Sequence, residues 1–97
     1  MSAEKNYINA YFQLGYCYYY GIGTETNKIK AFELYQIAAK KGNSSAQNNL
    51  GILYEKGEGV EKDLKMAFYW YNKSADNGLE VGLYNLARCY DYKIGIE

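Results

Sequence analysis

The fold is decided by residues 46–81, which read AQNNLGILYEKGEGVEKDLKMAFYWYNKSADNGLEV. Residues 10–45 align with this stretch without a gap, and twelve of the thirty-six positions are identical. A third copy begins at residue 82 and keeps Leu86 and Tyr90 in register. Self-similarity at a fixed period of this length is the signature of a repeat architecture. The chain therefore holds two full copies of a 36-residue unit and the first half of a third.

Each copy has the pattern of two helices. From Ala46, small and apolar residues recur at i+4, i+5 and i+8, which places them on one stripe of a helix with a period of 3.6 residues. Gly57 and Gly59 then end this helix, because glycine accepts the left-handed conformation common at helix C-termini. A second stripe starts at Ala67 and stops before Gly78. Applied to all copies, the pattern predicts helices over 6–20, 27–41, 46–56, 63–77 and 80–92.

Local signals support these helices. Asn27 and Asp63 precede the second helix of their copies, where a side-chain oxygen can cap the first amides. The run from Ser44 to Gln47 resembles a capping box, with the Ser44 hydroxyl as the cap. One helix pair cannot bury its apolar face alone, whereas stacked pairs share a continuous core. The chain has no proline, which favours uninterrupted helices. The sequence predicts an all-α protein, an α-solenoid of antiparallel helix pairs.

The spaced pattern is also that of a known repeat. Between Ala46 and Gly78 the chain reads Ala-x-x-x-Leu-Gly-x-x-Tyr-x-x-Gly-x-Gly-Val, then Asp, then Ala-Phe-Tyr-Trp-Tyr-x-Lys-Ser-Ala-x-x-Gly. This resembles the Sel-one-like repeat (SLR) family, a relative of the tetratricopeptide repeat. In the third copy Lys93 replaces the first loop glycine, which puts the geometry of that loop in doubt. We expect residues 1–97 to form a single domain of such repeats (10–45, 46–81 and partial 82–97) and to be a fragment of a longer protein.

Composition argues against several functional classes. Eleven basic and eleven acidic residues give no net charge, unlike the basic face of a nucleic-acid binder. Without any histidine, the commonest general base and metal ligand is missing. The glycine pairs follow helices and not strands, so they do not resemble phosphate-binding loops. We expect no catalytic residue, no cofactor and no metal, and therefore no enzyme.

The two cysteines bear on the compartment. Cys17 and Cys89 occupy the same position two repeats apart, so their Cα atoms should lie well beyond the ~7 Å limit for a disulfide. Two free thiols, together with a first segment that lacks the apolar stretch of a signal peptide, favour a cytoplasmic, intracellular protein. No run of about 18 apolar residues is present, so we expect no direct membrane insertion.

A partner-binding surface is expected by analogy with tetratricopeptide-like solenoids, in which the first helix of each pair lines the concave side. Its residues are those of the first helices that packing does not use: Phe12, Gln13, Tyr16, Tyr19, Tyr20, Asn48, Asn49, Ile52, Glu55, Lys56, Tyr84, Asn85, Arg88, Asp91 and Tyr92. In this set Gln13, Asn49 and Asn85 form a row of amides that can bind the backbone of an extended peptide. Lys56 and Arg88 can meet an acidic group, and the aromatic residues can serve as anchors.

Two functions of different classes follow. The resemblance implies a scaffold or adaptor module that binds a peptide or partner protein along the concave face. The alternative is a structural spacer, or a segment that self-associates through its terminal helix, in a larger protein whose activity lies elsewhere. Because the third copy stops after its first helix and about three repeats are usually needed for stability, the alternative stays open.

Overall fold

Five α-helices follow one another in the computed structural model, which describes residues 2–96 and the side chains of residues 6–96. They are α1 (Ser2–Tyr20), α2 (Lys28–Lys40), α3 (Ser44–Lys56), α4 (Leu64–Asp76) and α5 (Glu80–Tyr92). This part of the chain contains no strand. The five predicted helices are confirmed; α1 begins four residues earlier than the repeat pattern indicated, and the other bounds differ by at most two residues.

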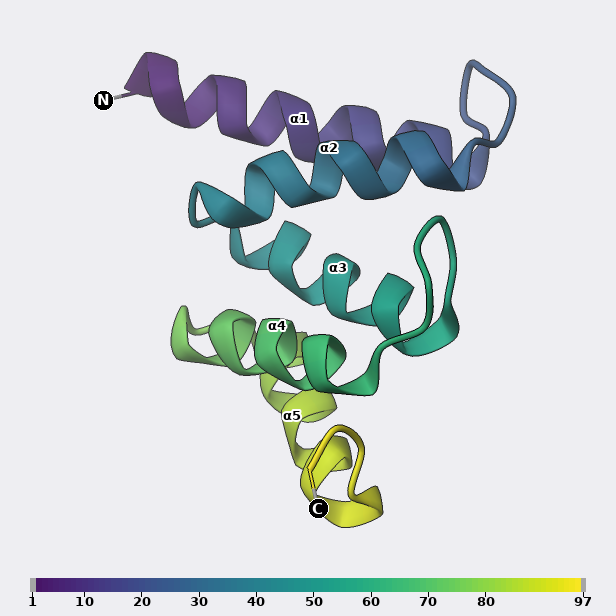
Figure 1. Cartoon of the computed structure of the whole chain (residues 1–97). Helices are drawn as coiled ribbons and strands as arrows, with labels where there is room; N and C mark the ends of the chain where they lie inside the picture. The colour runs from purple at the N-terminus through teal and green to yellow at the C-terminus, as the bar shows by residue number, and fades with distance from the viewer. Residues whose placement is uncertain (1, 97) are drawn as a thin grey trace.

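The helices are stacked in chain order (Figure 1). Each helix packs against the next one along the chain, and α3 also contacts α5 directly. The helix pair α1–α2 forms one end of the stack, α3–α4 the middle and α5 the other end, so that the two chain termini lie at opposite ends. The resulting body measures 38 × 31 × 17 Å. The predicted α-solenoid of antiparallel helix pairs is confirmed.

Helix starts are set by side-chain caps. The Asn27 side chain accepts a hydrogen bond from the Lys30 amide at 3.0 Å, and Asp63 accepts from two amides at the start of α4, as predicted. The capping box at Ser44 is wrong by one residue. Asn43 is the cap, since its Oδ1 accepts from the Ala46 amide at 2.8 Å, and α3 therefore already includes Ser44.

Close contact between the helices of a pair depends on glycine. A Cβ placed on Gly51 would lie 2.7 Å from ring carbons of Tyr71, and one on Gly15 would lie 2.8 Å from the ring of Tyr35. Both tyrosines are 1% exposed, so their rings fill the space that these glycines leave. The same arrangement in two copies shows why the pattern pairs glycine on the first helix with tyrosine on the second.

Loops connect successive repeats through a second set of glycines. Gly59 and Gly95 both have a φ of +75°. A Cβ on either residue would overlap a backbone carbonyl oxygen of the preceding repeat, that of Lys28 or that of Leu64. Each loop therefore packs against the first residue of the preceding second helix, α2 or α4, and helps to hold neighbouring repeats together.

Lys93 keeps the last loop in the common geometry despite its side chain. Its φ of 56° is left-handed, close to the 70° of Gly57 one repeat earlier. A left-handed conformation costs a non-glycine residue roughly 1–2 kcal/mol, and the greater freedom of glycine in the unfolded chain offsets part of that cost. Lys93→Gly is therefore expected to raise the free energy of unfolding by up to about 1 kcal/mol, as measured by chemical denaturation.

Lys65→Gly is the matched control, because Lys65 lies within α4. There the same change should lower the free energy of unfolding by roughly 0.5 kcal/mol, at the lower end of the cost of glycine in a helix, because Lys65 lies in the first turn of α4. Equal losses in both variants would show that the conformation of Lys93 carries no strain.

Two further expectations concern the thiols and the membrane. Both cysteines are free, as the repeat spacing predicts; Cys89 is buried and Cys17 is half-buried. Burial raises the pKa of the Cys89 thiol. Along the described residues, no helix has the combination of length and apolar character that crossing a bilayer requires.

Candidate binding groove

Two adjoining cavities lie on the side of the molecule formed by α1, α3 and α5. The first, the α1–α3 cavity, has a volume of about 120 Å³ and is lined by Tyr19, Tyr20, Tyr35, Asn49, Ile52, Leu53 and Lys56. The second, the α3–α5 cavity, has a volume of about 280 Å³ and is lined by Ile52, Glu55, Lys56, Tyr71, Tyr84, Asn85 and Arg88. Because Ile52 and Lys56 line both cavities, the two cavities adjoin along α3, and together they are called the groove below.

The α1–α3 cavity is mainly aromatic and aliphatic. Tyr35 reaches it from α2, and burial raises the pKa of this tyrosine to about 12. The Tyr19 hydroxyl donates a hydrogen bond to Glu58 Oε1 at 2.6 Å. Desolvation and the neighbouring Glu58 carboxylate raise the pKa of Tyr19 to about 12 as well. Both phenols are therefore neutral near pH 7, and the wall of this cavity carries no phenolate charge.

An ion pair between repeats borders this cavity. Lys28 Nζ, at the start of α2, lies 2.9 Å from Glu58 Oε2 in the loop after α3. The same ammonium lies 4.3 Å from the centre of the Tyr19 ring, close enough for a cation–π contact. Hydrogen bonds from Tyr19 and Lys28 hold the pKa of the Glu58 carboxyl below its usual value. Glu58 thus ties α1 and α2 to the following repeat.

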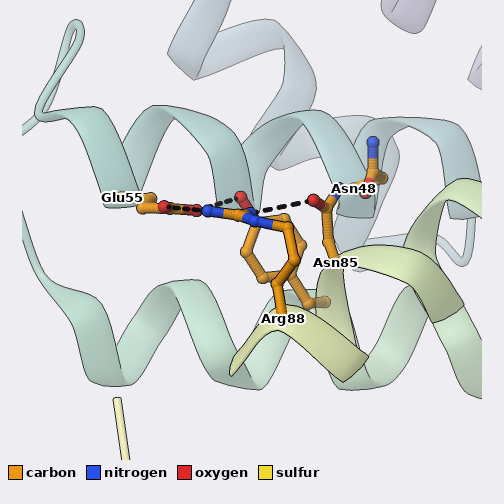
Figure 2. A network of polar contacts seen from close by, with 5 residues as sticks. Asn48, Glu55, Asn85 and Arg88 are labelled. Carbon is orange, nitrogen blue, oxygen red and sulfur yellow. Dashed lines mark hydrogen bonds and ion pairs between the residues drawn. The ribbon is translucent and has the colours of Figure 1, made fainter. Parts of the chain in front are cut away.

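The α3–α5 cavity contains a polar network, shown in Figure 2. Glu55 accepts hydrogen bonds from the Tyr71 hydroxyl at 2.7 Å and from Arg88 Nη2 at 2.8 Å. Arg88 Nη1 also donates to Asn85 Oδ1 at 3.0 Å, and Asn85 Nδ2 donates to Asn48 Oδ1 at 2.8 Å. The network joins α3, α4 and α5.

The charges of this network stabilise one another. The hydrogen bonds from Arg88 hold the pKa of the Glu55 carboxyl below its usual value, and the same interaction raises the pKa of Arg88. Burial, reinforced by Glu55, raises the pKa of Tyr71. At neutral pH the network therefore consists of a carboxylate, a guanidinium and a neutral phenol.

The structure brings together most of the residues predicted to form the binding surface. Those that line the groove are Tyr19, Tyr20, Asn49, Ile52, Glu55, Lys56, Tyr84, Asn85 and Arg88. Those that line neither cavity are Phe12, Gln13, Tyr16, Asn48, Asp91 and Tyr92. Phe12 is half-buried and packs against the core, with its ring centre 5.8 Å from that of Tyr35. Tyr92 is 74% exposed at the end of α5.

Three details of the predicted surface need correction. Asn48 does not face a ligand, because it is 5% exposed and bonded to Asn85. Arg88 is not free to meet an acidic group, since Glu55 already occupies its guanidinium. The row of amides is uneven: Gln13 is exposed outside the groove, Asn85 is committed to the network, and Asn49 alone lines the α1–α3 cavity.

Sequence reasoning missed three lining residues, Tyr35, Leu53 and Tyr71. The two tyrosines recur in register one repeat apart, a pattern that indicates packing within each repeat, and their rings are buried. Their position opposite Gly15 and Gly51 is the signal that reveals their second role. Each tyrosine ring packs against the glycine of the first helix of its repeat, and the same residue also lines the cavity beside that helix.

Comparisons with known proteins agree with the repeat pattern. The Sel1 repeat family model matches residues 8–43, 44–79 and 81–97. No curated protein matches the chain in sequence. The solved structures that resemble it include a Sel1 repeat protein from Oxalobacter formigenes, at 37% identity and a TM-score of 0.83 over 97% of this chain and 71% of that one.

Two further solved structures are similar. A protective antigen of uropathogenic Escherichia coli that displays an SLR fold has a TM-score of 0.91 and 33% identity, and it covers 97% of this chain. This chain spans only 20% of the length of that antigen. Helicobacter pylori cysteine-rich protein B has a TM-score of 0.79 and 27% identity over 87% of this chain and 63% of its own. Since the repeat model matches nearly every residue from 8 to 97, the chain belongs to the Sel1 repeat family.

Proposed function

We propose that this chain is a protein–protein interaction module that holds an extended segment of a partner in the groove. Sel1 repeats are generally modules of this kind and are typically non-catalytic scaffolds. The observation that carries the proposal is that the two cavities adjoin, since Ile52 and Lys56 of the central helix α3 line both. A single ligand lying across α1, α3 and α5 would contact all three repeats at once.

The lining of the groove suits an extended backbone. Asn49 is half-buried on α3, and its amide can both donate to and accept from a peptide group. Tyr20 and Ile52 line the same cavity and provide apolar surface near it. Backbone hydrogen bonds supply affinity that tolerates many sequences, while the neighbouring cavities can select particular side chains.

Replacing Asn49 by alanine is expected to weaken peptide binding about tenfold or more. The change leaves a peptide group of the ligand unpaired in a partly desolvated groove, at a cost of about 1–3 kcal/mol. Folding should change little, because Asn49 is not part of the buried core. The measurement is a fluorescence titration of the folded chain with peptides selected from a random display library.

The control for this titration is Lys73→Ala. Lys73 lies on α4 and lines a separate cavity between α2 and α4, away from the groove. Affinity should be unchanged in this variant. If Lys73→Ala weakens binding and Asn49→Ala does not, the ligand occupies the α2–α4 side, and the assignment to the groove is wrong.

The role of the whole protein is a wider proposal. The E. coli antigen that this chain resembles is about five times longer than the matched part, so further repeats or other domains can surround such a segment. We assign this chain an adaptor role within an intracellular, non-enzymatic assembly. The support is the membership in a family of generally non-catalytic interaction repeats, the free thiols and the groove itself.

A second candidate, a structural spacer or self-associating segment, is favoured by the two ends of the stack. On α1, Tyr7 is 71% exposed and Leu14 is 48% exposed; on α5, Leu83 is 60% exposed and Tyr90 is 59% exposed. The residue equivalent to Leu14 in the next repeat, Leu50, is fully buried against α2. The mass in solution, measured by light scattering across a concentration series, separates a monomeric module from a self-associating one.

A further inference from the structure

The charges around the groove are unevenly paired. Arg88 is held by Glu55 at 2.8 Å, and Lys28 by Glu58 at 2.9 Å. Lys56, in the last turn of α3, has no carboxylate oxygen within 4.0 Å among residues 6–96. Of these charged residues only Glu55, Lys56 and Arg88 line the cavities, so the lining carries one excess positive charge. That charge belongs to Lys56.

The nearby carboxylates do not hold the Lys56 ammonium. Lys56 contributes to the lowered pKa of both Glu55 and Glu58, so its field reaches them. Each of these carboxylates already has both oxygens bonded to other donors, Tyr71 and Arg88 in one case and Tyr19 and Lys28 in the other. An exposed ammonium between two internally satisfied ion pairs is the group left for a ligand.

The cavity beside Lys56 has the size of one apolar side chain. Its volume is about 120 Å³, and its wall combines three tyrosines with Ile52 and Leu53. Apolar cavities of roughly 150 Å³ hold a single benzene ring. A leucine, isoleucine or phenylalanine side chain therefore matches the α1–α3 cavity, with the Asn49 amide on the same wall to bind the adjoining backbone.

We infer that the groove recognises an extended peptide in which a large apolar residue and an acidic residue lie two positions apart. The apolar side chain enters the α1–α3 cavity, and the carboxylate pairs with Lys56. Alternate side chains of an extended chain point to the same side, about 6.5 Å apart, so residues two positions apart can both face the groove. This inference rests on the proposed function and names the class of partner segment that it would bind.

The first experiment is a selection from a random peptide library displayed on phage, with the full chain immobilised. The expected result is enrichment of an aspartate or glutamate two positions from a leucine, isoleucine or phenylalanine. With Lys56→Gln as the bait the acidic preference should disappear, while the apolar preference remains. Lys65→Gln is the matched control, since Lys65 is an exposed lysine outside the groove. That bait should select the same peptides as the wild-type chain.

The second experiment is a double-mutant cycle on one selected peptide. Exposed ion pairs contribute about 0.2–1 kcal/mol, so Lys56→Gln should weaken binding by a factor of about 1.4 to 5 at low salt. Changing the acidic residue of the peptide to its amide should cost the same factor with the wild-type chain and nothing further with Lys56→Gln. The factor should shrink as salt is added, because the pair is exposed.

A third variant separates this inference from the proposed function. Ile52→Arg places a bulky charge where the two cavities meet and should abolish binding of any peptide that lies in the groove. If selected peptides lose affinity for Ile52→Arg but show no acidic preference, or are indifferent to Lys56→Gln, the inference is overturned and the proposed function stands. If Ile52→Arg binds them like the wild-type chain, the groove is not the site, and both fail.

Discussion

Gly51→Val is expected to lower the free energy of unfolding by about 3 kcal/mol, near the upper end of the usual cost of overpacking a core. Even the first added carbon would lie 2.7 Å from the ring of Tyr71 and 3.2 Å from the Ala67 carbonyl oxygen. The ring is 1% exposed and cannot move into solvent without opening the core. Valine has a slightly better helix propensity than glycine, but by only a few tenths of a kcal/mol. The cost of overpacking therefore exceeds the gain in helix propensity, and Gly51→Val should lower the free energy of unfolding.

The control is Ala87→Val, at the equivalent position one repeat later. Ala87 is exposed, because no second helix packs on that side of α5 within the described chain. The substitution should cost about 0.5 kcal/mol, which is the difference in helix propensity. Both variants are compared with the wild-type chain by urea denaturation. Similar losses at the two positions would mean that the helix contact is looser than the structure has it.

Glu55→Ala is expected to cost about 2 kcal/mol of stability and to loosen the groove. The Tyr71 hydroxyl would lose its acceptor within a buried environment, at a cost of about 1–3 kcal/mol for such an unpaired group. Arg88 would lose its partner as well, but its side chain is 30% exposed and water can solvate it. In a Tyr71→Phe background the cost of Glu55→Ala should be clearly smaller, because the orphaned hydroxyl is then absent.

The pH dependence of unfolding gives an independent readout of the same carboxylate. Because the pKa of Glu55 is lowered in the folded chain, its contribution is fully present above the ordinary carboxyl value of 4.5 and is lost as the pH falls through the lower folded value. Below pH 4.5 the wild-type chain should therefore lose stability more steeply than Glu55→Ala. Glu61→Ala, which removes an exposed carboxylate from the loop that follows α3, should follow the wild-type profile. Parallel profiles for all three chains would show that Glu55 is not held by its partners.

Much of the fold can be predicted from the sequence, because it depends on local and periodic patterns of residues. The register of Leu14 with Leu50, and of Gly15 with Gly51, gives the period and the helices. Asn27 and Asp63 set the starts of α2 and α4 through contacts within three residues along the chain. The predicted cap of α3, Ser44, was wrong by only one position. Asn43 and Ser44 are both residue types that cap helices well, and the sequence alone does not show which of them is used.

The face that carries the groove was also predictable, whereas the state of its side chains was not. The residues expected there follow from the analogy with tetratricopeptide-like solenoids, and nine of the fifteen line the two cavities. Helical periodicity says which way a side chain points but not what it meets. Arg88 and Glu55 are 33 residues apart in the chain, and Asn85 and Asn48 are 37 apart, so their pairing depends on how one repeat is rotated against the next. The row of amides expected from the sequence is therefore interrupted at Asn85.

By itself, the sequence determined the helices and their 36-residue stacking, because these depend on contacts within one repeat that recur in the next. The tertiary structure alone decided which charges of the face that carries the groove remain open. Arg88 and Lys56 are both basic residues expected on that face, yet one lies against the carboxylate of another helix and the other does not. Ion pairs form between groups that packing brings within about 4 Å, and a one-dimensional pattern holds no such distance.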